Sequence, residues 1–514
     1  MNAQEYEELA AACDALLRSS DTSLGRIAIP LLHLINEHPS LLVAYEPLLA
    51  APAGRQQSAS PASRSAPAGA GTILRRAARA LGRTARSGLR PAAAVPAGNV
   101  DVLIVSHLNH PAQLQAAEDF YFGDLQRLLR ERGATSMVAL VNNLPPALTA
   151  PEAAHAPAMR TVLPDSLPLL AELRVWAAGA AAGRALLAAA NRAHPSLYQA
   201  LAHLAARQAF SGSAVRNLRL HRCIANLCRQ LNPRIVITTY EGDASERLIW
   251  HAARQAQRRP LCVGYQHTSL RAHAHAVRRR VNAPGLRCDP DVVLTLGEIT
   301  EAALAASEAL RPVQLITYGT HRRPHLTAGT ITVERDPLCL VLPDADPAEC
   351  DILFRFALDC ARQMPAVNFL LRPHPMSRFD ATALRVLSTS AIPANVTLST
   401  EGTLAQHCAR ARYCLYRGSS AVIEAVLAGV KPFYLARPQE LSIDPIYQLD
   451  RWRESVTRPA EFSARAAASG NADTDAARHA REFCDRYLAS VRTTALDTLL
   501  ELAAADQARV RTVG

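Results

Sequence analysis

One stretch of the sequence combines a tight turn, two hydroxyl groups and the start of a helix. Gly418-Ser419-Ser420 follows an apolar run and precedes residues 421–428, which have helical character. A helix start offers unpaired N–H groups and a partial positive charge, which together suit a phosphate. Glu424 lies one turn along the same face, where a carboxylate can accept hydrogen bonds from ribose hydroxyls. The stretch predicts either a nucleotide-phosphate site or an ordinary capped αβ unit.

A histidine and a lysine are further candidates for phosphate binding. His374 stands between two prolines in Arg372-Pro373-His374-Pro375, which follows an apolar strand. Because the prolines restrict the backbone, this imidazole can donate from a fixed position to a phosphate or a base carbonyl. Lys431 is the chain's one lysine, and its compact ammonium would suit the same role. A structural histidine in a turn and a lysine retained by chance are the alternatives.

Acidic side chains follow another apolar strand. Residues 234–239 have the pattern of a buried strand, and Glu241, Asp243 and Glu246 come directly after it. A carboxylate in this position could act as the general base that activates an acceptor hydroxyl. Asp243 and Glu246 fit the acid-rich first turn of a helix equally well. The sequence therefore leaves both interpretations open.

Three more strand ends carry polar side chains. Gln266 and His267 follow the buried residues 261–265, and His267 could stabilise a leaving phosphate, orient a carboxylate, or be a satisfied core histidine. His107 and Asp344 lie in loops after two other predicted strands. We expect Gln266, His107 and Asp344, together with Asp243 and Glu246, to contact the donor or the acceptor of a group-transfer reaction.

These loops share one position because each follows a strand of a predicted parallel sheet. Apolar runs alternate with helical segments, and this βαβ pattern predicts parallel sheets with helices on both faces. Two such sheets in tandem place a cleft between the carboxyl ends of their strands, where ligands bind in open α/β sheets. The predicted strands are residues 99–106, 136–141, 234–239, 261–265, 292–296 and 313–317 in one domain, and 338–342, 368–371, 396–399, 413–416 and 433–435 in the next.

Length and charge divide the chain of 514 residues into several parts. We expect a helical appendage over 1–50, a basic Ala/Pro-rich linker over 51–98, Rossmann-like domains over 99–325 and 326–460, and a helical tail over 461–514. The linker holds eight arginines and no acid, so it supplies eight of the +11 net charge and leaves +3 elsewhere. That balance argues against a nucleic-acid binder. Residues 73–90 could lie on an anionic membrane surface or form a solvated linker.

Cysteine usage and the N-terminus indicate the cellular compartment. The 11 cysteines are scattered without a CxxC pair, so neither a disulfide framework nor a zinc site is predicted. The first residues are acidic and lack an apolar core, and no apolar run is long enough to cross a bilayer. We expect a cytoplasmic protein, peripheral at the inner membrane if residues 73–90 bind there.

The order of these motifs resembles the GT-B glycosyltransferases, most closely the bacterial enzymes of surface-carbohydrate biosynthesis. Arg372-Pro-His374-Pro375 resembles the His-Pro motif of bacterial sialyl- and polysialyltransferases and capsular Kdo transferases, and Ser419-Ser420 resembles their Ser-Ser motif. Tyr240-Glu241-Gly242-Asp243 is similar to their acidic motif, although a tyrosine stands where the first acid would be. The resemblance covers about residues 100–450.

The resemblance implies an α/β fold of GT-B type, with an N-terminal acceptor domain and a C-terminal donor-nucleotide domain. It implies that Glu241 is the catalytic base and that a CMP leaving group departs without a metal; from its place after a buried strand, we expect His267 to be catalytic as well. Asp344-Ala-Asp346 spells a DxD pattern, which we interpret as a helix-capping loop. The resemblance implies that the donor nucleotide binds to His374, Ser419 and Ser420. From the residues of the same loops we also expect donor contacts by Arg372, Pro375, Gly418, Glu424 and Lys431.

The expected function is transfer of a sugar from a nucleotide-sugar donor to a surface polysaccharide or a lipid-linked acceptor. A CMP-linked donor of Kdo or of a sialic-acid-like sugar is favoured, with no tightly bound cofactor and no nucleic-acid partner. Three alternatives stay open: polyol-phosphate transfer from a CDP donor, 2-epimerisation of a nucleotide-sugar, and a non-catalytic scaffold for polysaccharide assembly.

Overall fold

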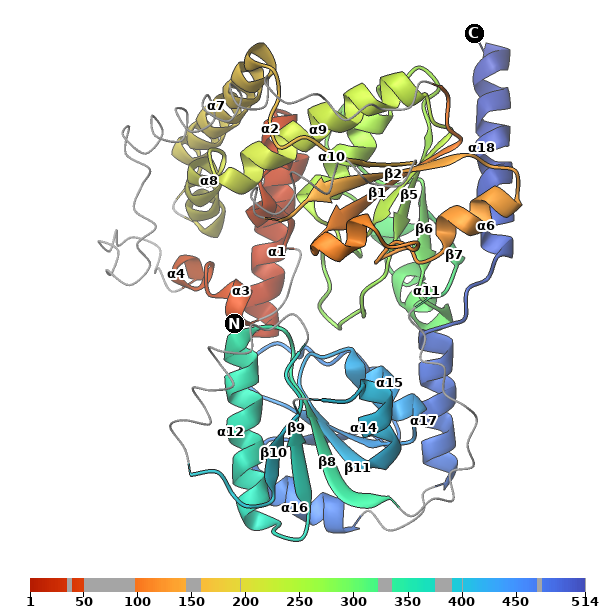
Figure 1. The fold of residues 1–514 in the computed structure, drawn as a ribbon. Coiled ribbons are helices and arrows are strands. Elements are labelled where there is room, and N and C mark those ends of the chain that lie inside the picture. Colours follow the sequence, from red (N-terminus) through yellow and green to blue (C-terminus); the bar gives the residue numbers. More distant parts are fainter. Residues whose placement is uncertain are drawn as a thin grey trace.

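The computed structural model contains two parallel β-sheets, one above the other in Figure 1. It describes residues 1–34, 39–49, 98–144, 159–194, 196–321, 335–374, 391–399, 401–468 and 474–513. The predictions made for residues 51–97, for 73–90 within them and for Pro375 fall outside these ranges. Helices flank both sheets, which confirms the predicted α/β class.

The first sheet has seven parallel strands in the order β3-β2-β1-β4-β5-β6-β7. Side chains of β1 alternate between two apolar layers: Leu103 and Val105 pack with α9 and α10, whereas Val102 and Ile104 pack with α6 and α18. The strands are β1 (Val102–Leu108), β2 (Ser136–Asn142), β3 (Arg160–Val162), β4 (Ile235–Thr239), β5 (Leu261–Tyr265), β6 (Val292–Thr295) and β7 (Gln314–Thr317). The helices are η2 (Pro111–Leu114), α6 (Leu125–Glu131), α7 (Leu169–Arg192), α8 (Leu197–Gln208), α9 (Gly212–Leu231), α10 (Ala244–Ala253), α11 (Glu298–Ala305) and η5 (Glu308–Leu310).

The second sheet has six parallel strands in the order β10-β9-β8-β11-β12-β13. One face packs on α12 and α16, and the other packs on α15 and α17. The strands are β8 (Asp336–Leu342), β9 (Asn368–Leu371), β10 (Val396–Leu398), β11 (Ala411–Tyr416), β12 (Lys431–Leu435) and β13 (Glu454–Val456). The helices are α12 (Pro347–Gln363), α14 (Leu404–Arg410), α15 (Ala421–Leu427) and α16 (Pro459–Ala468).

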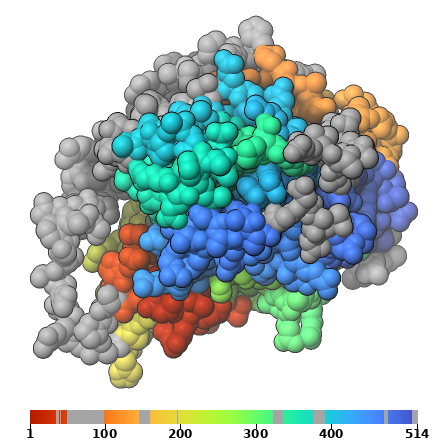
Figure 2. Space-filling view, turned by 90° about the horizontal axis from the view of Figure 1, so that it is seen from below, coloured from red at the N-terminus to blue at the C-terminus, as the bar shows by residue number. Residues whose placement is uncertain are grey.

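The N-terminal helices belong to the first domain and reach the second. Tyr6, Leu9 and Leu16 are fully or almost fully buried in the core that also contains α8, α9 and α10. Leu42 and Glu46 line a hollow of about 180 Å³ together with Ile352 of the second domain. Seen from below, the red N-terminal segment lies beside the teal and blue second domain (Figure 2). These helices are α1 (Ala3–Arg18), α2 (Leu24–Ile27), η1 (Pro30–His33), α3 (Pro39–Leu42) and α4 (Glu46–Leu49).

The C-terminal helices connect the two domains. Helix α17 (Thr474–Tyr487) packs on α15 of the second domain and on α11 of the first. The chain then returns, and α18 (Thr494–Val513) lies along the first sheet (Figure 1). All 11 cysteines are buried free thiols, so no disulfide connects the domains.

Two strands were missed by the sequence patterns. Residues 151–230 read as mainly helical, but β3 forms an edge of the first sheet, and β13 forms an edge of the second. Each strand has only three residues, which is too short for an alternating pattern to be recognised. The first predicted strand was also placed two residues early, so His107 lies within β1 and not in the loop after it.

Candidate functional site

A cleft of about 390 Å³ lies where the carboxyl ends of the two sets of strands face each other. It is lined by loops after β4, β5, β8, β9 and β11, as the sequence predicted for these loops. The structure therefore brings nine of the candidate residues into one site, and they are Glu241, Gln266, His267, Asp344, His374, Gly418, Ser419, Ser420 and Glu424.

Glu241 and His267 form a pair on the first-domain side. The Nε2 atom of His267 lies 3.0 Å from Oε1 of Glu241, and the Glu241 side chain is 45% exposed to the cleft. Partial burial raises the pKa of Glu241, but contact with His267 and the nearby charges of His107 and Arg271 outweigh it, so the net shift is downward from 4.5. Glu241 is therefore a carboxylate at neutral pH, as a general base must be.

The side chain of Glu246 holds the loop that carries Glu241 by hydrogen bonds to the backbone of the loop. The buried carboxylate of Glu246 accepts hydrogen bonds from the backbone N–H groups of Glu241, Gly242 and Asp243, at 2.9–3.0 Å. Asp243 caps α10 by accepting from the N–H of Ser245. Neither carboxylate lines the cleft. Asp243 and Glu246, expected to contact a substrate, instead form a capping box that fixes the loop.

His107 supports the pair from β1. Its Nε2 lies 3.5 Å from the hydroxyl of Thr239, and its ring packs edge-on against Tyr121. The same tyrosine packs against His267, with ring centroids 4.9 Å apart. Burial lowers the pKa of His107 below 6.5, although Glu241 opposes the shift. His107 thus lies behind the pair formed by Glu241 and His267, and it does not line the cleft.

Gly418, Ser419 and Ser420 form the second-domain wall. Gly418 adopts a φ of +74°, and a Cβ there would lie 2.8 Å from Oδ2 of Asp344, so only glycine fits. Ser420 precedes α15 without a side-chain capping bond. The backbone N–H groups of Ser420 and Ala421 have no hydrogen-bond acceptor among the described residues. This wall therefore offers N–H and hydroxyl donors to a ligand.

A buried arginine holds that wall in place. Arg417 is fully buried beside Gly418 and pairs with the carboxylates of Glu349 and Glu440. It also donates to the carbonyl oxygen of Leu435 at 3.2 Å. The role of Arg417 could not be predicted from the sequence, because an arginine at a strand end has no spacing that signals burial. Its contacts connect the turn to α12 and to the segment after β12.

His374 and Glu424 complete the second-domain side. Burial lowers the pKa of His374 below 6.5, despite the nearby charge of Asp344, so its imidazole is neutral at pH 7 and presents one N–H donor. Burial raises the pKa of Glu424 above 4.5, while Arg372 opposes the shift. Arg372 lies behind the cleft, where it donates to the carbonyl of Gly402 at 3.0 Å and contacts His407.

Lys431 lies away from the cleft, contrary to its expected role in nucleotide binding. It is the first residue of β12, and a parallel strand places its first residue at the sheet edge opposite its carboxyl end. There its ammonium lies 3.4 Å from a carboxylate oxygen of Glu454 and 5.8 Å from the ring centroid of Phe433. Its contacts are structural.

Arg271 lines the cleft although no sequence pattern predicted it. It comes from the first domain, and its Nη2 lies 3.1 Å from Oδ2 of Asp344 and 3.5 Å from the carbonyl oxygen of Gly418 in the second. Arg271 is the one arginine or lysine among the described residues that line the cleft. It follows β5 in a segment without a periodic pattern, so only its position after a strand could have signalled it.

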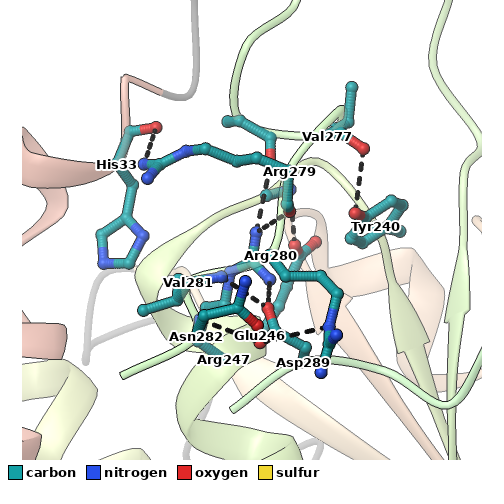
Figure 3. Close-up of polar contacts among 12 residues, drawn as sticks. His33, Tyr240, Glu246, Arg247, Val277, Arg279, Arg280, Val281, Asn282 and Asp289 are labelled. Carbon is teal, nitrogen blue, oxygen red and sulfur yellow. Dashed lines mark hydrogen bonds and ion pairs between the residues drawn. The ribbon is translucent and has the colours of Figure 1, made fainter. Parts of the chain in front are cut away.

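The segment from residue 268 to 291 is long and irregular, yet it is tightly held (Figure 3). Buried Arg247 of α10 pairs with Asp289 and donates to the carbonyls of Ala276 and Arg279. The hydroxyl of Tyr240 donates to the carbonyl of Val277 at 2.9 Å. Tyr240 stands where the similar family motif has an acid, and here it anchors the segment that carries Arg271.

The N-terminal helices brace the same segment from outside. Asp14 of α1 pairs with Arg279 and lies 3.1 Å from Nε2 of His275. Arg279 also donates to the carbonyls of Leu32 and His33, both at 3.3 Å (Figure 3). Contacts between the N-terminal helices and the segment that carries Arg271 were not expected from the sequence.

The DxD pattern does not form a metal site in the described residues. Asp344 lines the cleft and pairs with Arg271, whereas Asp346 caps α12 through the N–H groups of Ala348 and Glu349. Within the described ranges, no three His, Cys, Asp or Glu side chains gather as metal ligands would. Likewise, no described helix is long and apolar enough to cross a membrane.

Two Rossmann-type domains that face each other across such a cleft are the GT-B arrangement. No protein-family model and no curated protein matches the sequence. Among solved structures, the chain is similar to the glycotransferase of kitacinnamycin, at 13% identity and a TM-score of 0.42 over 79% of this chain and 100% of that one. It is also similar to the calicheamicin glycosyltransferase CalG4, at 15% identity and a TM-score of 0.45 over 79% of this chain and 98% of that one.

A third similar structure is the UDP-GlcNAc 2-epimerase from Neisseria meningitidis, bound to UDP-GlcNAc. It has 12% identity and a TM-score of 0.42, over 78% of this chain and 99% of that one. Similarities this distant carry no information on the reaction. The chemistry must be argued from the cleft.

Proposed function

We propose that this protein is an inverting, nucleotide-sugar-dependent glycosyltransferase. The observation that carries the proposal is the placement of Glu241 in one wall of the cleft, with His374, Ser419 and Ser420 in the wall formed by the other domain. A transferase needs a base for the acceptor hydroxyl and a separate site for the donor phosphate. The cleft offers both within one volume of about 390 Å³.

In the proposed reaction, Glu241 takes the proton of the acceptor hydroxyl while the hydroxyl oxygen bonds to the anomeric carbon of the donor. The bond between that carbon and the phosphate oxygen breaks, and the nucleotide leaves with the electron pair. Arg271, the N–H of His374 and the hydroxyls of the serines stabilise the negative charge on the leaving phosphate. His267 orients the carboxylate of Glu241. Attack opposite the leaving group inverts the anomeric centre.

Among the described residues that line the cleft, three acidic side chains, those of Glu241, Asp344 and Glu424, face one guanidinium, that of Arg271. A CMP-linked Kdo or sialic-acid-like sugar brings two negative charges, one on the phosphodiester and one on the sugar carboxylate. The diphosphate of a neutral-sugar donor also brings two. The charge of the cleft therefore does not distinguish these donors, and CMP is proposed because the sequence motifs imply it.

The donor sugar and the acceptor are proposed from the sequence motifs alone. They are Kdo or a sialic-acid-like sugar, and a growing surface polysaccharide or a lipid-linked acceptor. Such acceptors are assembled at the cytoplasmic face of the inner membrane, where we place this protein. No nucleic-acid partner is proposed.

Thermal unfolding with CMP, CDP, UDP and GDP tests the donor site. A ligand that binds only the folded chain raises its apparent stability. We expect CMP to stabilise the wild type and Lys431→Ala, which lies outside the cleft, and to have little effect on His374→Ala. Stabilisation by UDP or GDP instead of CMP would mean that the donor carries another nucleotide, while the proposal of a glycosyltransferase would stand. Stabilisation by CDP alone would favour polyol-phosphate transfer. Failure of all four nucleotides would reject the proposal.

A further inference from the structure

Helix α7 exposes large apolar side chains on the outer surface of the first domain. Leu169, Leu170 and Leu173 in its first two turns are 47%, 71% and 54% exposed, and Leu187 near its end is 44% exposed. Exposed leucines occur singly on most proteins, whereas three of them within two turns of one helix form an apolar patch of the kind that marks a binding surface. In Figure 1, α7 lies at the periphery of the molecule, on the side of the first sheet opposite α18.

The exposed side chains of α7 lie on one side of the helix. An exposed series at intervals of three and four consists of Leu170, Leu173, Ala177, Ala181, Arg184 and Ala188, and Leu169 and Leu187 lie at the border of this face. The opposite face is buried: Val175 and Leu186 pack in the core, and a Cβ at Gly179 would lie 2.9 Å from the carbonyl oxygen of Ala209. Helix α7 is thus firmly seated on α8, and its leucines point outward from a rigid support.

The charges beside this face are of one sign. Residues 169–210 contain a single acid, Glu172, and it is buried against the guanidinium of Arg219 at 2.7 Å. The exposed charged side chains of α7 and α8 are Arg174, Arg184, Arg192 and Arg207. We define the outer face of α7 as Leu169, Leu170, Leu173, Arg174, Arg184 and Leu187.

The sequence that precedes the first domain adds to this charge. Helix α4 packs against α8 and ends at Leu49, directly before residues 51–98 with their eight arginines and no acid. The most basic part of the sequence therefore follows a helix that packs on α8, the neighbour of α7.

We propose that the outer face of α7 docks on an anionic lipid bilayer. The leucines would enter the boundary between headgroups and acyl chains, and the arginines would contact lipid phosphates at the same depth. A second copy of the chain fits less well, because a two-fold pairing of this face would bring like-charged arginines together with no exposed acid between them. The inference stands independently of the reaction in the cleft.

Vesicle flotation of the full-length chain tests the proposal. We expect binding to vesicles of phosphatidylglycerol and phosphatidylcholine, little binding to phosphatidylcholine alone, and at least a fivefold loss of binding for L170Q/L173Q. The matched control is Ile392→Gln, an apolar residue 47% exposed in the second domain, which should bind as the wild type does. Both variants alter exposed side chains, so their thermal unfolding should match the wild type.

Three results would overturn the proposal. The first is a wild-type chain that does not float with anionic vesicles. The second is unchanged binding by L170Q/L173Q, which would assign membrane contact to another segment such as 51–98. The third is a wild-type dimer in light scattering that L170Q/L173Q converts to a monomer, which would assign the face to a second copy.

Discussion

At the scale of single residues, the proposed reaction depends on how Glu241 is kept ionised and aimed. Its carboxylate contacts His267, its backbone N–H is held by Glu246, and the rings of His107 and Tyr121 pack behind the pair. Under this proposal Glu241 is the base, and the neighbouring candidates of the first domain position it. Residue type alone could not separate these roles, because Glu241, Asp243 and Glu246 are all acids after one strand.

Replacement of Glu241 by glutamine should abolish transfer while donor binding survives. An amide cannot take the acceptor proton, and loss of a general base costs about 10²–10⁴-fold in kcat. CMP should still raise the unfolding temperature, because the phosphate donors lie in the other domain. Release of CMP from a CMP-sugar in the presence of acceptor measures the rate. Turnover within threefold of wild type would show that Glu241 is not the base.

Gly418→Ala should remove the nucleotide site, and Gly133→Ala supplies a matched control. Both glycines have nearly the same positive φ, +74° and +72°, so both variants pay about 1–2 kcal/mol of backbone strain. Only at residue 418 would the new Cβ press on Asp344, since Gly133 has no atom within 4 Å of that position. We expect the backbone strain to destabilise both variants, the contact with Asp344 to destabilise Gly418→Ala further, and the CMP response to be lost in Gly418→Ala alone. If CMP raised the unfolding temperature of both variants, the phosphate would have to bind outside the turn at Gly418.

At the scale of elements, the regular parts were predictable and the irregular ones were not. The strand over 261–265 and the helix after Gly418 follow from apolar runs bounded by polar turns. The segment from 268 to 291 has no such pattern, because its shape is set by distant partners, Arg247 and Asp14. The position of Arg271 could therefore not be derived from local sequence.

The bracing of this segment by α1 predicts an effect of Asp14→Asn. The variant leaves buried Arg279 without its carboxylate, which should cost about 2–4 kcal/mol at pH 7. The Michaelis constant for the donor should also rise, because the braced segment carries Arg271. Urea unfolding and donor titration measure the two effects. Glu8→Gln, at an exposed position of the same helix, is the control and should change neither. Unchanged donor kinetics in Asp14→Asn would show that the brace serves folding only.

The loss in free energy of unfolding caused by Asp14→Asn should become smaller in acid. Burial raises the pKa of Asp14, but the hydrogen bond with His275 and the charge of Arg279 outweigh burial and lower it below 3.8. A lowered pKa in the folded state contributes stability that is fully present above 3.8 and is lost as the pH falls through the lowered value. The difference between wild type and variant in free energy of unfolding should stay constant from pH 7 to 5 and narrow in stronger acid. A difference that widens in acid would contradict this assignment.

At the scale of the whole molecule, the two domains meet through two kinds of contact. The C-terminal helices form an apolar connection, in which Tyr487 of α17 accepts from the N–H of Leu270 at 2.6 Å. Among the described residues, an ion pair between Arg271 and Asp344 bridges the cleft. The sequence predicted two sheets and a cleft, but not this bridge, since its partners are 73 residues apart.

That bridge predicts that Asp344→Asn will bind CMP more tightly than the wild type. In the proposed complex Asp344 competes with the phosphate for Arg271 and repels it, and an amide of the same shape does neither. Both side chains are largely buried, and removal of about 1 kcal/mol of opposing interaction corresponds to about a fivefold lower Kd. Without nucleotide the variant should also show a larger radius of gyration in solution scattering, because the domains lose the ion pair across the cleft, and CMP should restore the wild-type value.

Asp346→Asn is the control. Asp346 caps α12 outside the cleft, so its replacement should leave the affinity for CMP and the radius of gyration unchanged. Weaker CMP binding by Asp344→Asn, with an unchanged radius, would instead make Asp344 a direct ligand of the nucleotide.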